Sequence, residues 1–153
     1  MENTEVVTQD TVSSDDKTLA LLSHLSLVLG GILLPVIIWA TQKDKSKFVR
    51  FHSLQSIFYH LSLAVIIAVV VIFVALILII AGIGFEAFNN HHGHNSGAFA
   101  ILVTIVLYGL IFVIGVGGVA YSVYAGIRAY KGEYFKFPVI GNLIYNKIYG
   151  QKP

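Results

Sequence analysis

Residues 61–83 read LSLAVIIAVVVIFVALILIIAGI, and Ser62 is the only residue in this stretch with a polar side chain. A helix rises about 1.5 Å per residue, so about 20 such residues cross the roughly 30 Å hydrocarbon core of a bilayer. The stretch belongs to one of three long segments that contain no Asp, Glu, Lys or Arg, at 18–42, 51–85 and 87–127. The sequence therefore predicts a multi-pass membrane protein.

The composition points the same way. The 153-residue chain is 56% hydrophobic and 12% charged, whereas soluble domains carry about 25% charged residues. Three membrane helices would use most of this length, which leaves no room for a soluble catalytic domain. We expect an all-α, multi-pass transmembrane helical bundle that forms a single domain at residues 15–150. Residues 1–14 are expected to be a disordered acidic tail.

The first apolar segment, residues 19–40, is interrupted. His24 lies within it, Gly30 and Gly31 follow, and Pro35 removes one backbone hydrogen bond from a helix. We expect one kinked spanning helix. The alternative is two short half-helices that form a re-entrant hairpin, because polar backbone at membrane depth is tolerated where protein covers it.

The second helix is expected to begin before the bilayer and to end near residue 83. Over residues 48–61 the polar side chains recur at helical spacing on one face. They form a candidate polar face of His52, Gln55, Ser56, Tyr59 and His60. This part of the helix should lie in the headgroup zone.

The third helix is expected over residues 98–130 and is rich in glycine. Gly118, Ser122 and Gly126 recur every four residues, which is the small-residue spacing that lets membrane helices approach closely. We predict that this face packs against another helix. Pro138 can then start a final short helix, whose apolar face predicts an interfacial amphipathic helix rather than a span.

Lysine and arginine counts predict the orientation. Four occur in the loop at 41–52 and five from residue 128 onward, against one in the tail and none at 84–97. With three spans, the basic loop and the C-terminus face the cytoplasm, while the tail and the 84–97 loop lie outside the cell membrane. A re-entrant first segment would move only the tail to the inside.

Histidines are the candidate ligands for a metal or haem. His91, His92 and His94 form an HHGH motif, but structural zinc sites need four well-placed ligands, and a solvated loop is the favoured interpretation. His24 and His60 would lie near opposite leaflets, which disfavours shared haem iron. We therefore expect no metal site and no cofactor. The chain has no cysteine, which excludes disulfides and thiolate metal sites.

The basic loop, KDKSKFVRFH, is explained as a topology signal or as a contact for anionic lipid headgroups. Four basic residues beside a membrane are weak evidence for nucleic acid, and we expect no nucleic-acid partner. The expected partners are the lipid bilayer and other membrane helices, in a homo-oligomer or a membrane complex.

A family resemblance rests on LSHLS, on the GG–P–IIW pattern, on KDKSKFVRFHSLQ and on GEYFKFP, and covers about residues 17–144. These segments resemble a bacterial family of small membrane proteins related to the Tic-twenty-like components of chloroplast inner-envelope protein import. The resemblance implies a multi-pass helical bundle and, by analogy, a link to protein translocation. It implies no catalytic residues.

The expected function is that of a non-enzymatic integral membrane protein, a scaffold or accessory subunit of a membrane complex. The motivation is the small-residue face on the third helix together with the absence of charge at membrane depth. The alternative is a small oligomeric channel or transporter for an unidentified solute, in which the polar face of the second helix lines an inner vestibule.

Overall fold

The computed structural model describes residues 12–29, 31–89 and 96–150. All regular secondary structure in this part of the chain is helical, so the prediction of an all-α protein is confirmed there. The helices are α1 (Ser14–Leu29), α2 (Leu33–Gln42), α3 (Lys47–Asn89), α4 (Ser96–Tyr130) and α5 (Ile140–Tyr149).

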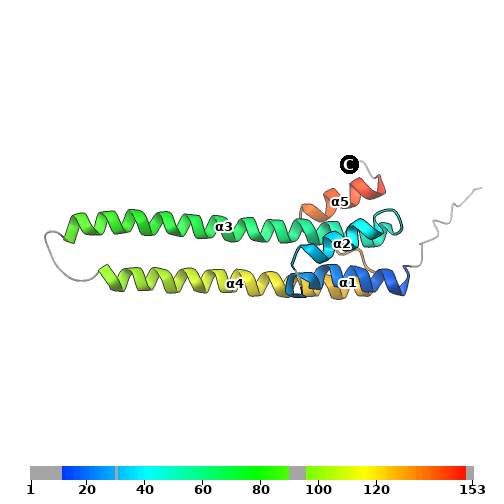
Figure 1. Ribbon diagram of the computed structural model, residues 1–153, viewed down its shortest axis with the longest axis horizontal. Helices are drawn as coiled ribbons and strands as arrows, with labels where there is room; N and C mark the ends of the chain where they lie inside the picture. Colours follow the sequence, from blue (N-terminus) through cyan, green and yellow to red (C-terminus); the bar gives the residue numbers. More distant parts are fainter. Residues whose placement is uncertain (1–11, 30, 90–95, 151–153) are drawn as a thin grey trace, which may run out of the picture.

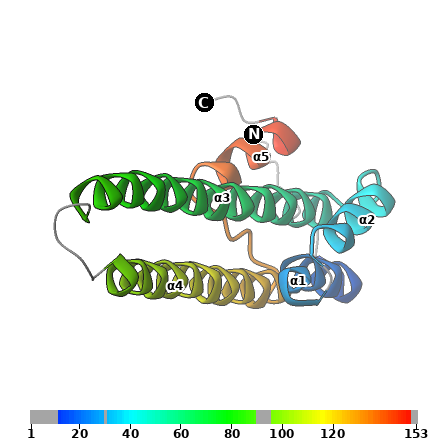
Figure 2. The ribbon, with the colours of Figure 1, turned by 60° about the vertical axis from the view of Figure 1, so that its left-hand side comes forward.

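The molecule is a long helical hairpin with a bundle at one end (Figure 1). The two long helices, α3 and α4, run side by side, and the three short helices gather where α3 begins and α4 ends (Figure 2). We call this end the base: α1, α2, α5, residues 47–63 of α3 and residues 117–130 of α4. Residues 65–80 of α3 and 101–116 of α4, further along the hairpin, are the arms.

The predicted single span over residues 19–40 is wrong, because this segment forms two short helices. Gly31 has φ +62, a conformation that side-chain-bearing residues rarely adopt, and its N–H donates to Ser26 O at 2.6 Å. The chain therefore turns after α1. Pro35 lies in the first turn of α2, where its missing N–H costs no helical hydrogen bond, so it kinks nothing. The structure therefore has two short helices in this segment, as in the alternative interpretation, rather than one kinked helix.

Local signals fix the helix ends of the base. Ser13 Oγ accepts from Asp16 N at 3.1 Å at the start of α1, and Ser46 Oγ accepts from Val49 N at 3.2 Å at the start of α3. At the end of α4, Gly132 has φ +83. Its N–H donates to Ala129 O, and the next N–H donates to Arg128 O. This paired C-terminal cap ends the helix and releases the segment that leads to α5.

Short side chains allow the helices of the base to pack closely. Ala20 of α1, Phe48 of α3 and Ala129 of α4 form a buried cluster. Phe137, in the segment before α5, is also buried, with its ring centroid 5.5 Å from that of His24 and 4.7 Å from that of Tyr59. The base therefore has an interior of its own, to which α1, α3, α4 and the segment before α5 all contribute.

The arms, in contrast to the base, expose large apolar side chains on their surface. Almost all side chains of the arms are apolar. Several large ones are at least 60% exposed, among them Ile72, Phe73, Phe112 and Val113. In the described part of the chain, Lys47–Ile80 and Ile101–Tyr130 are long and apolar enough to cross a membrane. Helix α2 is apolar but has only 10 residues, which is too short to span. The predicted three spans thus reduce to two candidates.

Candidate functional site

The base contains a polar interior, and the predicted polar face of α3 forms one wall of it. His52, Gln55 and Ser56 are fully buried, His60 is 7% exposed and Tyr59 is half-buried. These side chains point at α1, at α4 and at the segment before α5. They do not line an open vestibule in the described part of the chain.

Gln55 holds the segment between α4 and α5. Its Nε2 donates to Phe135 O at 2.9 Å, and its Oε1 accepts from Phe137 N at 3.1 Å. One side-chain amide thus satisfies two backbone groups of a non-helical segment, as a neighbouring strand would do. Gly141 is required beside it, because a Cβ there would lie 2.7 Å from Gln55 Oε1 and 2.7 Å from Lys136 Cα.

Two histidines meet at the centre of the base. His24 Nε2 and His52 Nδ1 are 3.1 Å apart, and both side chains are fully buried. One ring must donate and the other accept, which requires at least one neutral ring. Burial, with the nearby His60 as a smaller cause, lowers the pKa of His24 to about 3. His24 is therefore a neutral hydrogen-bonding group at physiological pH.

Buried serines surround this pair and bind backbone carbonyls. Ser56 Oγ donates to Ser23 O, which joins α3 to α1. Ser122 Oγ donates to His24 O at 2.8 Å, which joins α4 to α1. Ser53 Oγ donates to its own helix at Val49 O. The hydroxyl groups of Ser56 and Ser122 therefore link helices, and the residues of all three serines are at most 1% exposed.

The small-residue face of α4 lies against two different helices of the same chain. A Cβ at Gly118 would come within 3.0 Å of Leu63 on α3, and Tyr59 Oη donates to Gly118 O at 2.9 Å. A Cβ at Gly126 would come within 3.0 Å of Leu21 on α1. Ser122, between them, is bonded to α1 as described above. The three residues are therefore occupied by intramolecular packing.

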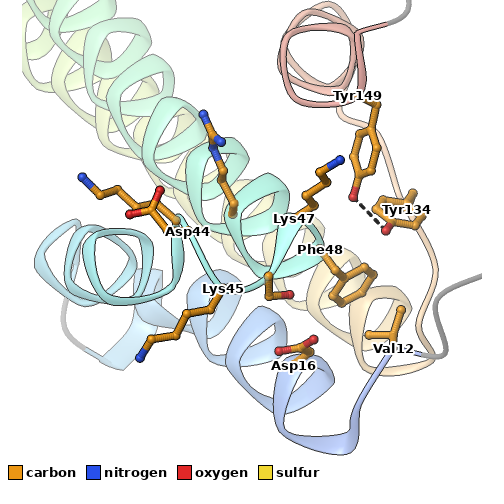
Figure 3. A pocket seen from close by; sticks show the side chains of 11 residues that line it. Val12, Asp16, Asp44, Lys45, Lys47, Phe48, Tyr134 and Tyr149 are labelled. Atoms are coloured by element: carbon orange, nitrogen blue, oxygen red, sulfur yellow. Dashed lines mark hydrogen bonds between the residues drawn. The ribbon is translucent and has the colours of Figure 1, made fainter.

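The basic loop borders a surface cavity of about 620 Å³ at the end of the base (Figure 3). Lys43, Lys45, Lys47 and Arg50 line it together with Asp16 and Asp44. Phe48 and Val12 also line it, and Figure 3 shows the hydrogen bond between the Tyr134 and Tyr149 hydroxyl groups, which is 2.8 Å long. Cations outnumber carboxylates around this cavity, so it favours anions.

Candidate metal ligands do not cluster in the part of the chain that the structure describes. No group of three or more His, Cys, Asp or Glu side chains there could hold a metal ion. His91, His92 and His94 of the HHGH motif lie outside the described residues. The predicted absence of a metal and a cofactor stays a prediction.

A protein-family model matches residues 15–144 of the chain. It is the model of the MamF/MmsF family, the magnetosome magnetite crystal formation protein family. The chain belongs to this family. No curated protein and no solved structure matches it. Family membership and the apolar helices together identify a membrane protein.

The resemblance to the Tic-twenty-like proteins is wrong, and the link to protein translocation that rested on it has no support. The segments that carried it all lie inside residues 15–144, the range matched by the MamF/MmsF family. Apolar helices, a basic loop and a Gly–Pro turn are physical requirements of small helical membrane proteins in general. Such features therefore do not distinguish one family of this kind from another.

Sequence reasoning placed His24 and His60 near opposite leaflets and named no partner for His24, whereas the structure places His24 against His52. The pairing depends on the turn at Gly31, after which α2 leads the chain back so that the start of α3 lies beside α1. Sequence reasoning also missed the two hydrogen bonds by which Gln55 holds the segment before α5. Its two partners lie 80 and 82 residues away in the chain, and no local pattern connects positions so far apart.

Proposed function

We propose that this protein is a non-enzymatic membrane scaffold or accessory subunit that takes part in magnetosome magnetite crystal formation. The observation that carries the proposal is the family match, which covers both long helices and the whole base except for the last residues of α5. The exposed apolar arms support insertion in a bilayer, since soluble proteins rarely expose apolar surface of this extent.

In this proposal the arms cross the membrane and the base lies at one face of it. The first turn of α1 lies at the same end as the basic loop, because Lys17 Cε would lie 3.1 Å from a Cβ at Gly132, just after α4. The tail then leaves on the side of the basic loop. The excess of Lys and Arg at this end favours a cytoplasmic base.

The short helices α1 and α2 are then a re-entrant or interfacial hairpin. Val28, Leu29 and Leu33, beside the turn between them, are each at least 60% exposed, and the turn faces along the hairpin toward the arms (Figure 1). An apolar tip of this kind is suited to the edge of the hydrocarbon core. Helix α5 lies at the same membrane surface as an interfacial helix.

The non-enzymatic role is supported by how the polar groups of the base are used. A catalytic nucleophile must be within reach of both a base and a substrate. Ser23, Ser56 and Ser122 instead donate to backbone carbonyls, and all three are at most 1% exposed. A channel has less support, because the polar face of α3 is filled by α1 and by the segment around Phe137.

Complementation in a magnetite-forming bacterium tests the proposal. The resident family member is deleted, the present chain is supplied, and crystal size and number are measured by electron microscopy. We expect the wild-type chain to restore both, and Gln55→Leu, which breaks the base, to fail at equal abundance. Thr104→Leu, a polar-to-apolar change in an arm, is the control and should restore both. Membrane insertion without any effect of the wild-type chain on the crystals would contradict the proposal.

A further inference from the structure

A second hollow of the base is a groove of about 350 Å³ between α2, α3 and α5. Its walls are largely apolar: Leu54 and Phe58 come from α3, Leu143 and Ile144 from α5, and Trp39 from α2. Leu143 is 66% exposed and Phe58 is 47% exposed, so the groove opens at the surface. Apolar walls with a few polar groups are typical of binding sites for apolar or amphipathic ligands.

The polar groups of this groove are all donors. Arg50 and Lys147 line it, and none of the described residues that line it is acidic. Trp39 Nε1 and Arg50 Nε are buried and have no hydrogen-bond partner. A buried donor without an acceptor costs free energy. The groove therefore combines apolar walls with two unsatisfied N–H groups and two positive charges, which together call for an amphipathic ligand that carries an anionic oxygen.

The groove is oriented along the expected membrane normal. Arg50 precedes Phe58 by eight residues on α3, a separation of about 12 Å along the helix axis. Phe58 is the end nearer to the arms, and Arg50 is the end nearer to the basic loop. Arg50 also lines the basic cavity shown in Figure 3, together with Lys43 and Lys47. The positive potential is thus concentrated at the end of the groove away from the arms.

We propose that this groove binds an anionic glycerophospholipid. An acyl chain lies along Phe58, Leu54 and Leu143, and the phosphate accepts hydrogen bonds from Arg50 and Trp39, with Lys147 as a second cation. The proposal rests on the placement of the base at a membrane surface. The occupant follows from charge complementarity, since a helix of a second copy would leave both buried N–H groups without an acceptor.

Native mass spectrometry of the full chain, released from mild detergent in the presence of phosphatidylglycerol or phosphatidylcholine, tests the proposal. We expect one tightly held phosphatidylglycerol, bound about tenfold more strongly than phosphatidylcholine. Arg50→Gln and Lys147→Gln should each reduce this preference several-fold. Lys131→Gln is the matched control: it removes the same charge from an exposed residue at the end of α4 that lines neither hollow.

The apolar half of the site is tested by Leu143→Gln, because this side chain is 66% exposed and the change removes little buried surface. We expect weaker phosphatidylglycerol binding with an unchanged oligomeric state, and no competition from glycerol phosphate, which has the headgroup without acyl chains. Effective competition would reduce the site to a simple anion site and overturn the proposal. Equal losses from Lys131→Gln and Arg50→Gln would show general surface charge and also overturn it. A change of oligomeric state with Leu143→Gln would assign the groove to a second copy instead. Crystal formation is not measured here, so failure of this proposal is distinct from failure of the function proposed above.

Discussion

The two halves of α3 differ in which side chains they bury and which they expose. In the base, its buried face carries His52, Ser53, Gln55 and Ser56, all fully buried. In the arm, residues 65–80 carry apolar side chains that are mostly exposed. The base is therefore held by hydrogen bonds and close backbone contacts between helices. The arm has few protein contacts of its own and depends on lipid for its environment. The same helix is a bundle element at one end and part of a candidate membrane span at the other.

The largest expected difference between the two regions comes from removing the amide of Gln55. Gln55→Leu leaves Phe135 O and Phe137 N without their partner, and each buried unsatisfied group costs about 1–3 kcal/mol. We expect the free energy of unfolding, measured by thermal unfolding in lipid nanodiscs, to fall by about 2–6 kcal/mol. Thr104→Leu, in the exposed arm, should be nearly neutral. Equal effects of the two changes would mean that the polar interior does not stabilise the base.

A smaller effect is expected from overpacking at the junction of base and arm. Gly118→Leu places a side chain where a Cβ alone would lie 3.0 Å from Leu63. Overpacking typically costs about 1–3 kcal/mol, visible as a lower midpoint of thermal unfolding. Ile105→Leu, 65% exposed on the same helix, is the control and should leave the midpoint unchanged. A wild-type midpoint for Gly118→Leu would show that α3 and α4 separate at this level.

Acidification should weaken the base alone. The pKa of His24 is about 3 in the folded protein and about 6.5 when unfolded. Between these values the unfolded chain binds a proton that the folded chain does not, so stability is full above pH 6.5 and falls as the pH is lowered toward 3. The slope from this group is at most about 1.4 kcal/mol per pH unit.

His52 contacts the ring of His24, and His60 is a smaller cause of its lowered pKa, so the informative measurement is the difference between wild type and His24→Gln. Thermal unfolding at pH 7.5 and 5.5 should show a smaller pH dependence for the variant. An unchanged pH dependence would contradict the account of His24 as a buried neutral ring. The described arm residues, 65–80 and 101–116, contain no His, Asp, Glu, Lys or Arg and should add nothing to the slope.

The arms were predictable from sequence and the base was only partly so. The composition of residues 61–83 is enough to predict a membrane helix, because a long apolar run without charge is what the hydrocarbon core of a bilayer requires. The polar face from His52 to His60 was also visible from its spacing. The partners of this face were not visible, because they lie between 28 and 82 positions away in the chain. The prediction for residues 19–40 was wrong because composition alone does not distinguish a kinked span from two short helices. Gly31 decides that question through its left-handed backbone.

The number and direction of the spans is the central claim, and cysteine accessibility measures it most directly in this cysteine-free chain. Ser14→Cys, Lys43→Cys and His92→Cys are made separately, and intact cells that hold the protein in the cell membrane are treated with an impermeant maleimide. Two spans with a cytoplasmic base predict labelling at position 92 alone, with positions 14 and 43 labelled only after lysis. Labelling at position 14 in intact cells would restore the three-span topology, and labelling at 43 but not 92 would reverse the orientation. Either result would contradict the account.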